Sequence, residues 1–348
     1  MKRHLNTLFV TTEGAYLKKD GQAVVVRIEK ENRLRLPLHN LDGIVCFGHI
    51  GFSPALLGAC AKSGVSISFM NMWGGFVAAV NGFTPGNVLL RREQYRVADD
   101  LDASLKIAVQ FITGKIANSR SVLLRAARDS SDSKSAEVLR FGAKQLAFDL
   151  DFAVKAKSLD QLRGIEGDSA NKYFKCFNDM ISPSARSEFS FTVRSRRPPL
   201  DRINCMMSFL YSMLTHDARS ACEACGLDAA VGFLHRDRPG RPGLSLDLIE
   251  EFRSFFVDRL VLSLINRRQV REKDFVVSPG GAVRLTDGAR KTVLQSYQKR
   301  KQDTITHPFL NEKTTIGLLL HLQSRLLARH LRGDTDTYPP FILSLIHI

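Results

Sequence analysis

Residues 232–253 have the sequence GFLHRDRPGRPGLSLDLIEEFR. This stretch places His235 before a turn rich in glycine and proline, and the turn leads into a helix predicted to begin near Ser245. Asp247 and Glu250 are three residues apart, so they project from the same face of that helix. A histidine beside two carboxylates can hold a divalent cation, and this stretch is therefore the first candidate site.

The acidic residues of this helix also allow an interpretation in which they neither bind a metal nor take part in catalysis. Acidic side chains in the first turns of a helix interact favourably with its dipole and can simply face water. By that interpretation the polar stripe, which continues through Glu251, Ser254 and Asp258, is solvated, and His235 is an ordinary surface histidine. Two points favour a function. The short segment 239–243 delivers His235 to the helix rigidly, and a protein that binds a polyanion has reason to avoid clustered carboxylates unless a cation neutralises them.

A second candidate ligand lies upstream. Glu166 is flanked by Gly164 and Gly167 inside a segment with helical periodicity. Glycine costs about 1 kcal/mol relative to alanine within a helix. Two glycines here indicate that something approaches the backbone closely, and both another helix and a phosphate group satisfy that condition.

The composition indicates what the protein binds. The chain has 348 residues and a formal net charge of +15, which favours a polyanionic partner such as nucleic acid. No run of 18 apolar residues is present, the N-terminus does not resemble a signal peptide, and the lone Cys222-x-x-Cys225 pair is weak evidence for zinc. We therefore expect a cytoplasmic protein with reduced cysteines and no membrane partner.

The periodicity predicts an α+β fold with a small N-terminal β-rich domain followed by a larger all-α domain. The predicted boundaries are residues 1–90, 91–335 and a tail at 336–348. Short β segments occur at 6–11, 15–19, 23–28, 34–38, 43–47, 65–70 and 75–80, with a helix from Ser53-Pro54 to about Lys62. Helices are predicted near 100–128, 134–157, 159–179, 200–225, 245–267, 287–301 and 312–331, with a hairpin at 275–285.

An arginine-rich loop at 182–199 interrupts the helices, and more arginines follow His235. Arginine donates two hydrogen bonds at once to phosphate, and aromatic rings can stack on unpaired bases. A solvated basic surface and buried aromatic rings are the alternative. The candidate nucleic-acid contacts are Tyr173, Arg194, Arg196, Arg197, Tyr211, Arg236, Arg238 and Arg241.

Several of these segments together resemble a known family. They are RGIEG with a following Tyr-Phe at 163–174, RPPLDRIN with SF-x-Y at 197–211, G-x-LH at 232–235, and SLDLIEEFR at 245–253. In this order and spacing the chain is similar to the CRISPR-associated Cas1 family, across nearly its whole length. The ending near 338–341 (YPPF) resembles the subtype I-C branch, whereas the last residues, LSLIHI, match no family ending.

The resemblance implies a function. The family contains the metal-dependent DNA endonuclease and integrase that acquires spacers in prokaryotic antiviral defence. It implies that Glu166, His235 and Glu250 are catalytic metal ligands for Mg²⁺ or Mn²⁺, and that Asp247 supports them. It also implies a homodimer formed through the β domains, the small Cas2 protein as a partner, and DNA partners that comprise the incoming spacer precursor and the CRISPR repeat.

The expected chemistry is attack of a 3′-hydroxyl, or of water, on a phosphodiester beside the bound metal. Two alternatives stay open. A non-catalytic, architectural DNA-binding protein would tolerate loss of Glu166 or Glu250. A metal-dependent RNase would prefer RNA over a matched DNA, since its site would sense the 2′-hydroxyl.

Overall fold

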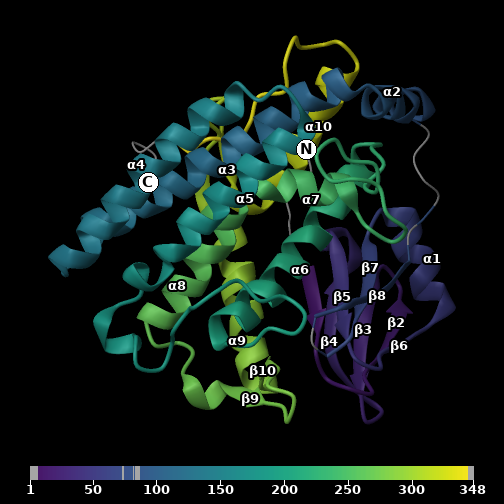
Figure 1. Cartoon of the computed structure of the whole chain (residues 1–348). Coiled ribbons are helices and arrows are strands. Elements are labelled where there is room, and N and C mark those ends of the chain that lie inside the picture. The colour runs from purple at the N-terminus through teal and green to yellow at the C-terminus, as the bar shows by residue number, and fades with distance from the viewer. Residues whose placement is uncertain (1–6, 73, 81, 83–86, 344–348) are drawn as a thin grey trace. The chain divides into compact units, whose positions relative to one another are not determined.

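The computed structural model describes residues 7–72, 74–80, 82 and 87–343 (Figure 1). The chain divides into two compact units, Met1–Gly86 with Leu294–Asp303, and Asn87–Val293 with Thr304–Ile348. The first is rich in β-strands and the second is mostly helical, which confirms the predicted α+β class. No helix among the described residues has both the length and the apolar character needed to cross a membrane. Of the predicted tail, residues 344–348 lie outside the described residues.

The β-rich unit is built from two four-stranded sheets and one helix. The first sheet has the order β1 (Thr7–Val10), β5 (Gly43–Phe47), β7 (Ser66–Met70), β8 (Phe76–Val80). The second has the order β4 (Glu31–Pro37), β3 (Ala23–Ile28), β2 (Tyr16–Asp20), β6 (Gly51–Phe52). Helix α1 (Pro54–Ser63) begins as predicted, because the Ser53 side chain accepts a hydrogen bond from the Leu56 N–H and Pro54 occupies the first helical position.

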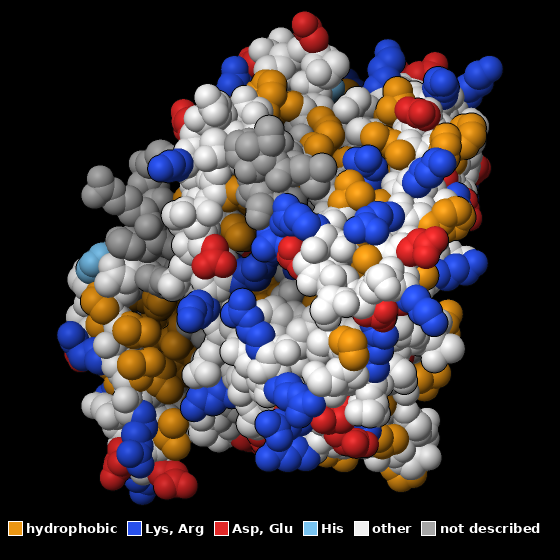
Figure 2. All heavy atoms as spheres, turned by 90° about the vertical axis from the view of Figure 1, so that its left-hand side faces the viewer, with side chains coloured by type: hydrophobic (Ala, Val, Ile, Leu, Met, Phe, Trp, Pro, Cys, Tyr) orange, Lys and Arg blue, Asp and Glu red, His pale blue; other side chains and the backbone are white. Residues whose placement is uncertain are grey.

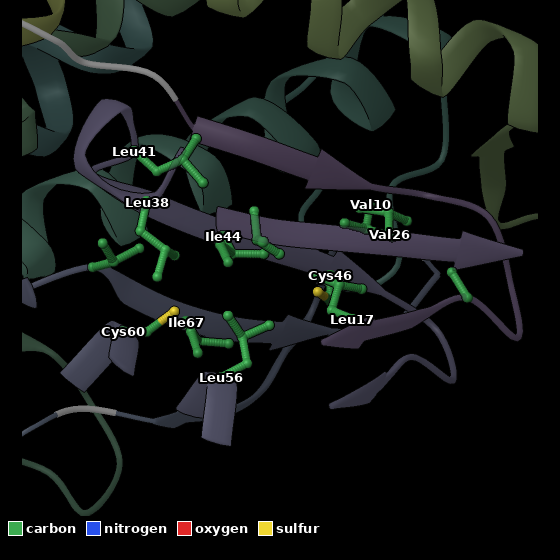
Figure 3. Packing of buried hydrophobic residues seen from close by; sticks show 13 residues of the cluster. Val10, Leu17, Val26, Leu38, Leu41, Ile44, Cys46, Leu56, Cys60 and Ile67 are labelled. Atoms are coloured by element: carbon green, nitrogen blue, oxygen red, sulfur yellow. The ribbon is translucent and has the colours of Figure 1, made fainter. Parts of the chain in front are cut away.

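The core of this unit draws on both sheets and on α1. Leu17 of β2 and Val26 of β3 pack in one cluster with Ile44 of β5, Ile67 of β7 and Leu56 of α1 (Figure 3). Each of these side chains is almost fully buried. Alternating residues of a strand point to opposite faces, which is why Leu17 of β2 is buried in this core whereas Tyr16 beside it is exposed.

The helical unit is built mainly from α-helices. They are α2 (Val88–Asp99), α3 (Leu101–Asp129), α4 (Ser133–Val154), α5 (Leu159–Lys175), α6 (Arg202–Ala224), α7 (Gly243–Glu250), α8 (Arg259–Asn266), the first part of α9 (Asp287–Lys301), and α10 (Leu319–Leu331). Helices α3, α4, α5 and α6 each begin at a capping side chain that accepts a backbone N–H bond, and these side chains are Asp100, Asp132, Ser158 and Asp201. These caps explain why the helix starts followed from the sequence.

Several local features differ from the predictions. The helix predicted over 245–267 is interrupted, because α7 is followed by a π-helical segment, η4 (Arg253–Asp258), before α8 begins. The start of the helix predicted at 312 is instead strand β12 (Lys313–Thr315), which pairs with β11 (Thr304–Thr306). Strand β6 was not predicted. The hairpin predicted at 275–285 does form, from β9 (Phe275–Val277) and β10 (Val283–Leu285). All six cysteines are free thiols, as expected.

Candidate active site

The segment that ends at His235 is held by the carboxylate of Asp247, a fully buried side chain of α7. Asp247 Oδ2 accepts the backbone N–H of Phe233 at 2.6 Å and that of Leu234 at 3.1 Å. Its Oδ1 accepts the backbone N–H of His235 at 3.1 Å and lies 2.6 Å from His235 Nδ1. Because a carboxylate only accepts, Nδ1 carries the proton, and the lone pair of Nε2 is left to act as a base or a ligand.

Two glycines allow this close approach. A Cβ atom at Gly232 would lie 2.7 Å from Asp247 Oδ2, and one at Gly243 would lie 2.6 Å from the carbonyl oxygen of Ala230. Neither contact is compatible with a larger residue unless the backbone shifts. Gly232 and Gly243 therefore bring His235 to α7, whereas residues 236–240 between them are exposed.

Three helices bring two carboxylates and one ammonium group together. The Nζ atom of Lys115, from the middle of α3, lies 2.7 Å from Oε2 of Glu250 at the end of α7. The same ammonium pairs with Oε1 of Glu166 on α5. His235 Nε2 is 4.0 Å from Oε1 of Glu250. The structure thus links the three residues implied as metal ligands through Glu250. His235 lies beside Glu250, and Glu166 shares the Lys115 ammonium with it.

The carboxylate of Glu250 is buried but remains ionised. Burial by itself raises the pKa of this group, but the positive charges of Arg253 and Lys115 outweigh burial and hold the pKa at about 2. Arg253 Nη1 lies 3.0 Å from Oε1 of Glu250. A buried carboxylate that stays charged at neutral pH is suited to binding a cation.

The solvated interpretation of the acidic helix is wrong. Asp247, Glu250, Glu251, Ser254 and Asp258 are each at most 3% exposed. Glu251 belongs to a separate network, in which it accepts hydrogen bonds from Tyr338 Oη at 2.6 Å and from the Phe341 N–H at 2.7 Å. The acidic stripe is therefore divided between the candidate site and a buried anchor for residues 338–341.

The glycines beside Glu166 are not explained by helix packing. A Cβ atom at Gly164 or Gly167 would meet nothing within 4 Å apart from the neighbouring backbone of the helix. No second helix in the described part of the chain needs this space. The surface of α5 beside Glu166 is therefore open to a ligand that approaches the backbone.

The predicted nucleic-acid contacts fall into two groups. A pocket next to the carboxylates is lined by Glu166 and Lys115 together with four of the predicted residues, Tyr173, Arg194, Arg196 and Tyr211. The structure does not bring Arg197, Arg236, Arg238 and Arg241 into this pocket lining. Arg236 instead pairs with Asp160 at 2.6 Å. Lys and Arg side chains are spread over the face shown in Figure 2.

The two tyrosines of the pocket are held by contacts within the protein and do not form a free surface on which bases could stack. Tyr173 is only 3% exposed. The hydroxyl of Tyr211 donates to Asp258 Oδ1 at 2.5 Å, and the guanidinium groups of Arg194 and Arg253 lie 5.4 and 5.1 Å from the centre of its ring. The ring of Tyr211 therefore helps to hold these two arginines in position.

Sequence reasoning missed Lys115 and Arg253 as parts of the site. The signal for Lys115 was a lysine inside an apolar helical run, QFITGKIA at 110–117. Among the described residues, no three His, Cys, Asp or Glu side chains form a ready-made metal site. The groups that could hold a cation are Glu166, Glu250 and His235, and the Lys115 ammonium lies between the two carboxylates.

Comparisons with known proteins identify the family. The model of CRISPR associated protein Cas1 matches residues 8–299. A CRISPR-associated endonuclease Cas1 of Chlorobaculum tepidum is 52% identical over 342 residues, which cover 98% of this chain and 99% of the relative. A Cas1 protein from Thermotoga maritima has a TM-score of 0.82 at 23% identity, covering 96% of this chain and 99% of that one. A casposase bound to integration product also has a TM-score of 0.82 at 23% identity, covering 99% and 96%. These two likenesses establish the fold, and the sequence matches establish that the chain belongs to the Cas1 family.

Proposed function

We propose that this chain is a metal-dependent DNA endonuclease and integrase of CRISPR adaptation, which inserts spacer DNA into the repeat array. The observation that carries the proposal is the convergence of Glu166 and Glu250, from different helices, on a single positive charge. The name of the Chlorobaculum relative, an endonuclease, and that of the casposase, bound to integration product, agree with it.

The residues fit a divalent cation by their chemistry. Two carboxylates and the Nε2 atom of one imidazole are donors that Mg²⁺ and Mn²⁺ accept, and Asp247 fixes the imidazole in the required tautomer. We assign Glu166, His235 and Glu250 as the ligands. When bound, the cation would supply Lewis-acid stabilisation of charge on the attacked phosphate.

The remaining residues bind and orient the DNA. Arg196 is exposed at the pocket, and Arg194 is held there by hydrogen bonds to Ser195 O at 2.6 Å and Ser208 Oγ at 3.1 Å. The guanidinium group of Arg196 would bind a phosphate next to the carboxylates. Arg194, through its internal hydrogen bonds, would support the pocket, and Arg253 would keep Glu250 charged. The attacking group is a 3′-hydroxyl in integration and water in cleavage.

The proposal also includes the assembly in which the chain acts. We infer a homodimer formed through the β-rich units, Cas2 as its partner in the cytoplasm of a prokaryote, and membership of subtype I-C. A solved complex with the same fold contains Cas1 together with Cas2. The DNA partners would be the incoming spacer precursor and the CRISPR repeat.

The test is strand transfer of a labelled DNA with a 3′-hydroxyl end into a supercoiled target. Wild type and Glu166→Ala should be compared with Mn²⁺, with Mg²⁺ and with EDTA, and DNA binding should be measured in parallel. Joining that requires metal and is lost in the variant, with binding retained, is the expected result. Binding without chemistry in every metal, also after Cas2 is added, would instead support an architectural protein. Preference for a matched RNA would support an RNase.

A further inference from the structure

The position of Lys115 has a consequence for metal binding. Its side chain is buried in α3, and its ammonium touches both carboxylates that we assign as ligands, one on α5 and one on α7. An ammonium ion and a divalent cation cannot both occupy the small space between two carboxylates, because they repel each other. The lysine therefore competes with any metal for the same two anions.

From this geometry we infer that Lys115 is an internal counterion that holds Glu166 and Glu250 together in the metal-free protein and moves aside when a metal binds. The inference rests on the proposed function, since it takes these carboxylates as the metal ligands. Without such a counterion, two carboxylates facing each other in a buried site would repel and would lack a charge partner. The lysine keeps the ligands in place at the cost of weaker metal binding.

The structure offers space for the displaced side chain. Lys115 lines the same pocket as Arg194 and Arg196, so its ammonium can move from the carboxylates towards the pocket. There it would face other positive charges unless an anion is present. A DNA phosphate in the pocket would therefore stabilise the displaced lysine, and metal and DNA should each strengthen the binding of the other.

The main test measures metal binding rather than activity. Mn²⁺ should be titrated into the DNA-free protein and followed by electron paramagnetic resonance, for wild type, Lys115→Met and Lys115→Arg. We expect Lys115→Met to bind Mn²⁺ about tenfold more tightly or better, because a competing positive charge has been removed. Lys115→Arg retains the charge and should remain within a few-fold of wild type.

A second lysine provides a matched control. Lys172, on the same helix as Glu166, also lies between two carboxylates, Asp149 and Asp168, each at 2.6 Å. Lys172→Met removes a comparable pair of ionic contacts outside the site and should leave Mn²⁺ affinity unchanged. If Lys115→Met and Lys172→Met both bind Mn²⁺ as wild type does, Lys115 is an ordinary ion-pair partner and the inference fails.

A measurement on the unsubstituted protein covers the case in which Lys115→Met does not fold. Nitrogen-15 spectra of lysine ammonium groups should show a Lys115 signal, identified by its loss in Lys115→Arg. Saturating Mg²⁺ should shift or abolish that signal and leave the Lys172 signal in place. A Lys115 signal that does not respond to saturating Mg²⁺ would overturn the inference.

Failure of the inference can be told apart from failure of the proposed function. If Glu166 is a ligand, the Glu166→Gln variant should bind Mn²⁺ more weakly than wild type does. If it has no effect, the assigned metal site is wrong and the role of Lys115 falls with it. If Glu166→Gln weakens binding while Lys115→Met leaves it unchanged, the metal site stands and only the counterion role is rejected.

Discussion

His235 Nδ1 lies 2.6 Å from Asp247 Oδ1, and the same carboxylate accepts three backbone N–H groups of residues 233–235. One buried side chain therefore fixes the path of the loop, the position of the imidazole and its tautomer. The arrangement explains why an acidic residue is required three positions before Glu250, even though it does not face the pocket.

Asp247→Asn should reduce both stability and activity. The amide nitrogen of asparagine cannot accept the N–H groups that Asp247 now binds, so at least one buried donor is left unsatisfied. We expect a loss of about 1–3 kcal/mol in the free energy of unfolding, measured with urea. Strand transfer should fall by about 10- to 100-fold, because the imidazole is no longer oriented. Normal activity in a destabilised variant would show that Asp247 supports only the loop.

A second prediction concerns the pH dependence of stability at Asp258. Burial raises the pKa of this carboxyl from 3.8 to about 6, despite hydrogen bonds from Tyr211 and Tyr173 that lower it. The folded state thus binds the proton more tightly than the unfolded chain does. The stability gained from this proton is present below pH 3.8 and is lost as the pH rises through about 6.

Asp258→Asn removes this titration. The free energy of unfolding of the variant, relative to wild type, should therefore increase as the pH is raised from about 3.5 to about 6.5, a range that brackets the two pKa values of 3.8 and about 6. Urea unfolding at several pH values measures the difference. A difference that stays constant over this range would contradict the raised pKa of Asp258.

Much of the fold followed from local sequence signals. Strand β3 forms at the predicted residues, and α3 and α5 begin at side chains that cap them. Strand β6 was missed because it has only two residues, and its pairing with β2 comes from a distant part of the chain. The π-helical segment after α7 was also missed, because periodicity cannot show where a continuous helix is distorted by what packs around it.

The candidate site was predictable only in part. His235 and Asp247 are close in sequence, so their contact followed from the turn between them. The meeting of Lys115 with Glu166 and Glu250 spans three helices that are far apart along the chain, and no local pattern reports it. Burial of the acidic stripe was likewise hidden, because helix-dipole arguments apply equally to solvated carboxylates.

A third prediction concerns Gln94, a buried residue of α2. Its Nε2 donates to the carbonyl oxygens of Asp228 and Val231, each at 2.8 Å, and its Oε1 accepts the N–H of Asp228 at 2.9 Å. These bonds fix the segment that leads to His235. Gln94→Leu should lower the free energy of unfolding by about 1–3 kcal/mol, since three backbone groups lose their partner.

The control for this prediction is the neighbouring residue. Tyr95→Phe removes one partly exposed hydrogen bond to the same segment, from Tyr95 Oη to Asp228 Oδ2 at 2.8 Å. It should cost less than about 1 kcal/mol. Equal effects of the two variants in urea unfolding would mean that Gln94 does not hold the segment as its contacts indicate.

The last prediction separates DNA contacts from structural arginines in the loop at 182–199. Arg196 and Arg197 are exposed, whereas the guanidinium of Arg194 is bound to Asn204 Oδ1 at 2.5 Å and to Ser208 Oγ. If the exposed pair binds phosphates, Arg196→Gln and Arg197→Gln should each reduce the slope of log K against log salt concentration by about one.

Arg194→Gln should act differently, by lowering the free energy of unfolding, because it breaks bonds within the protein. Fluorescence anisotropy of a labelled DNA duplex over a range of KCl concentrations gives the slopes. Arg332→Gln, which removes an exposed arginine paired with Asp334 at 2.7 Å, is the matched control and should leave the slope unchanged. If Arg196→Gln and Arg197→Gln also leave it unchanged, these two exposed arginines do not contact DNA phosphates.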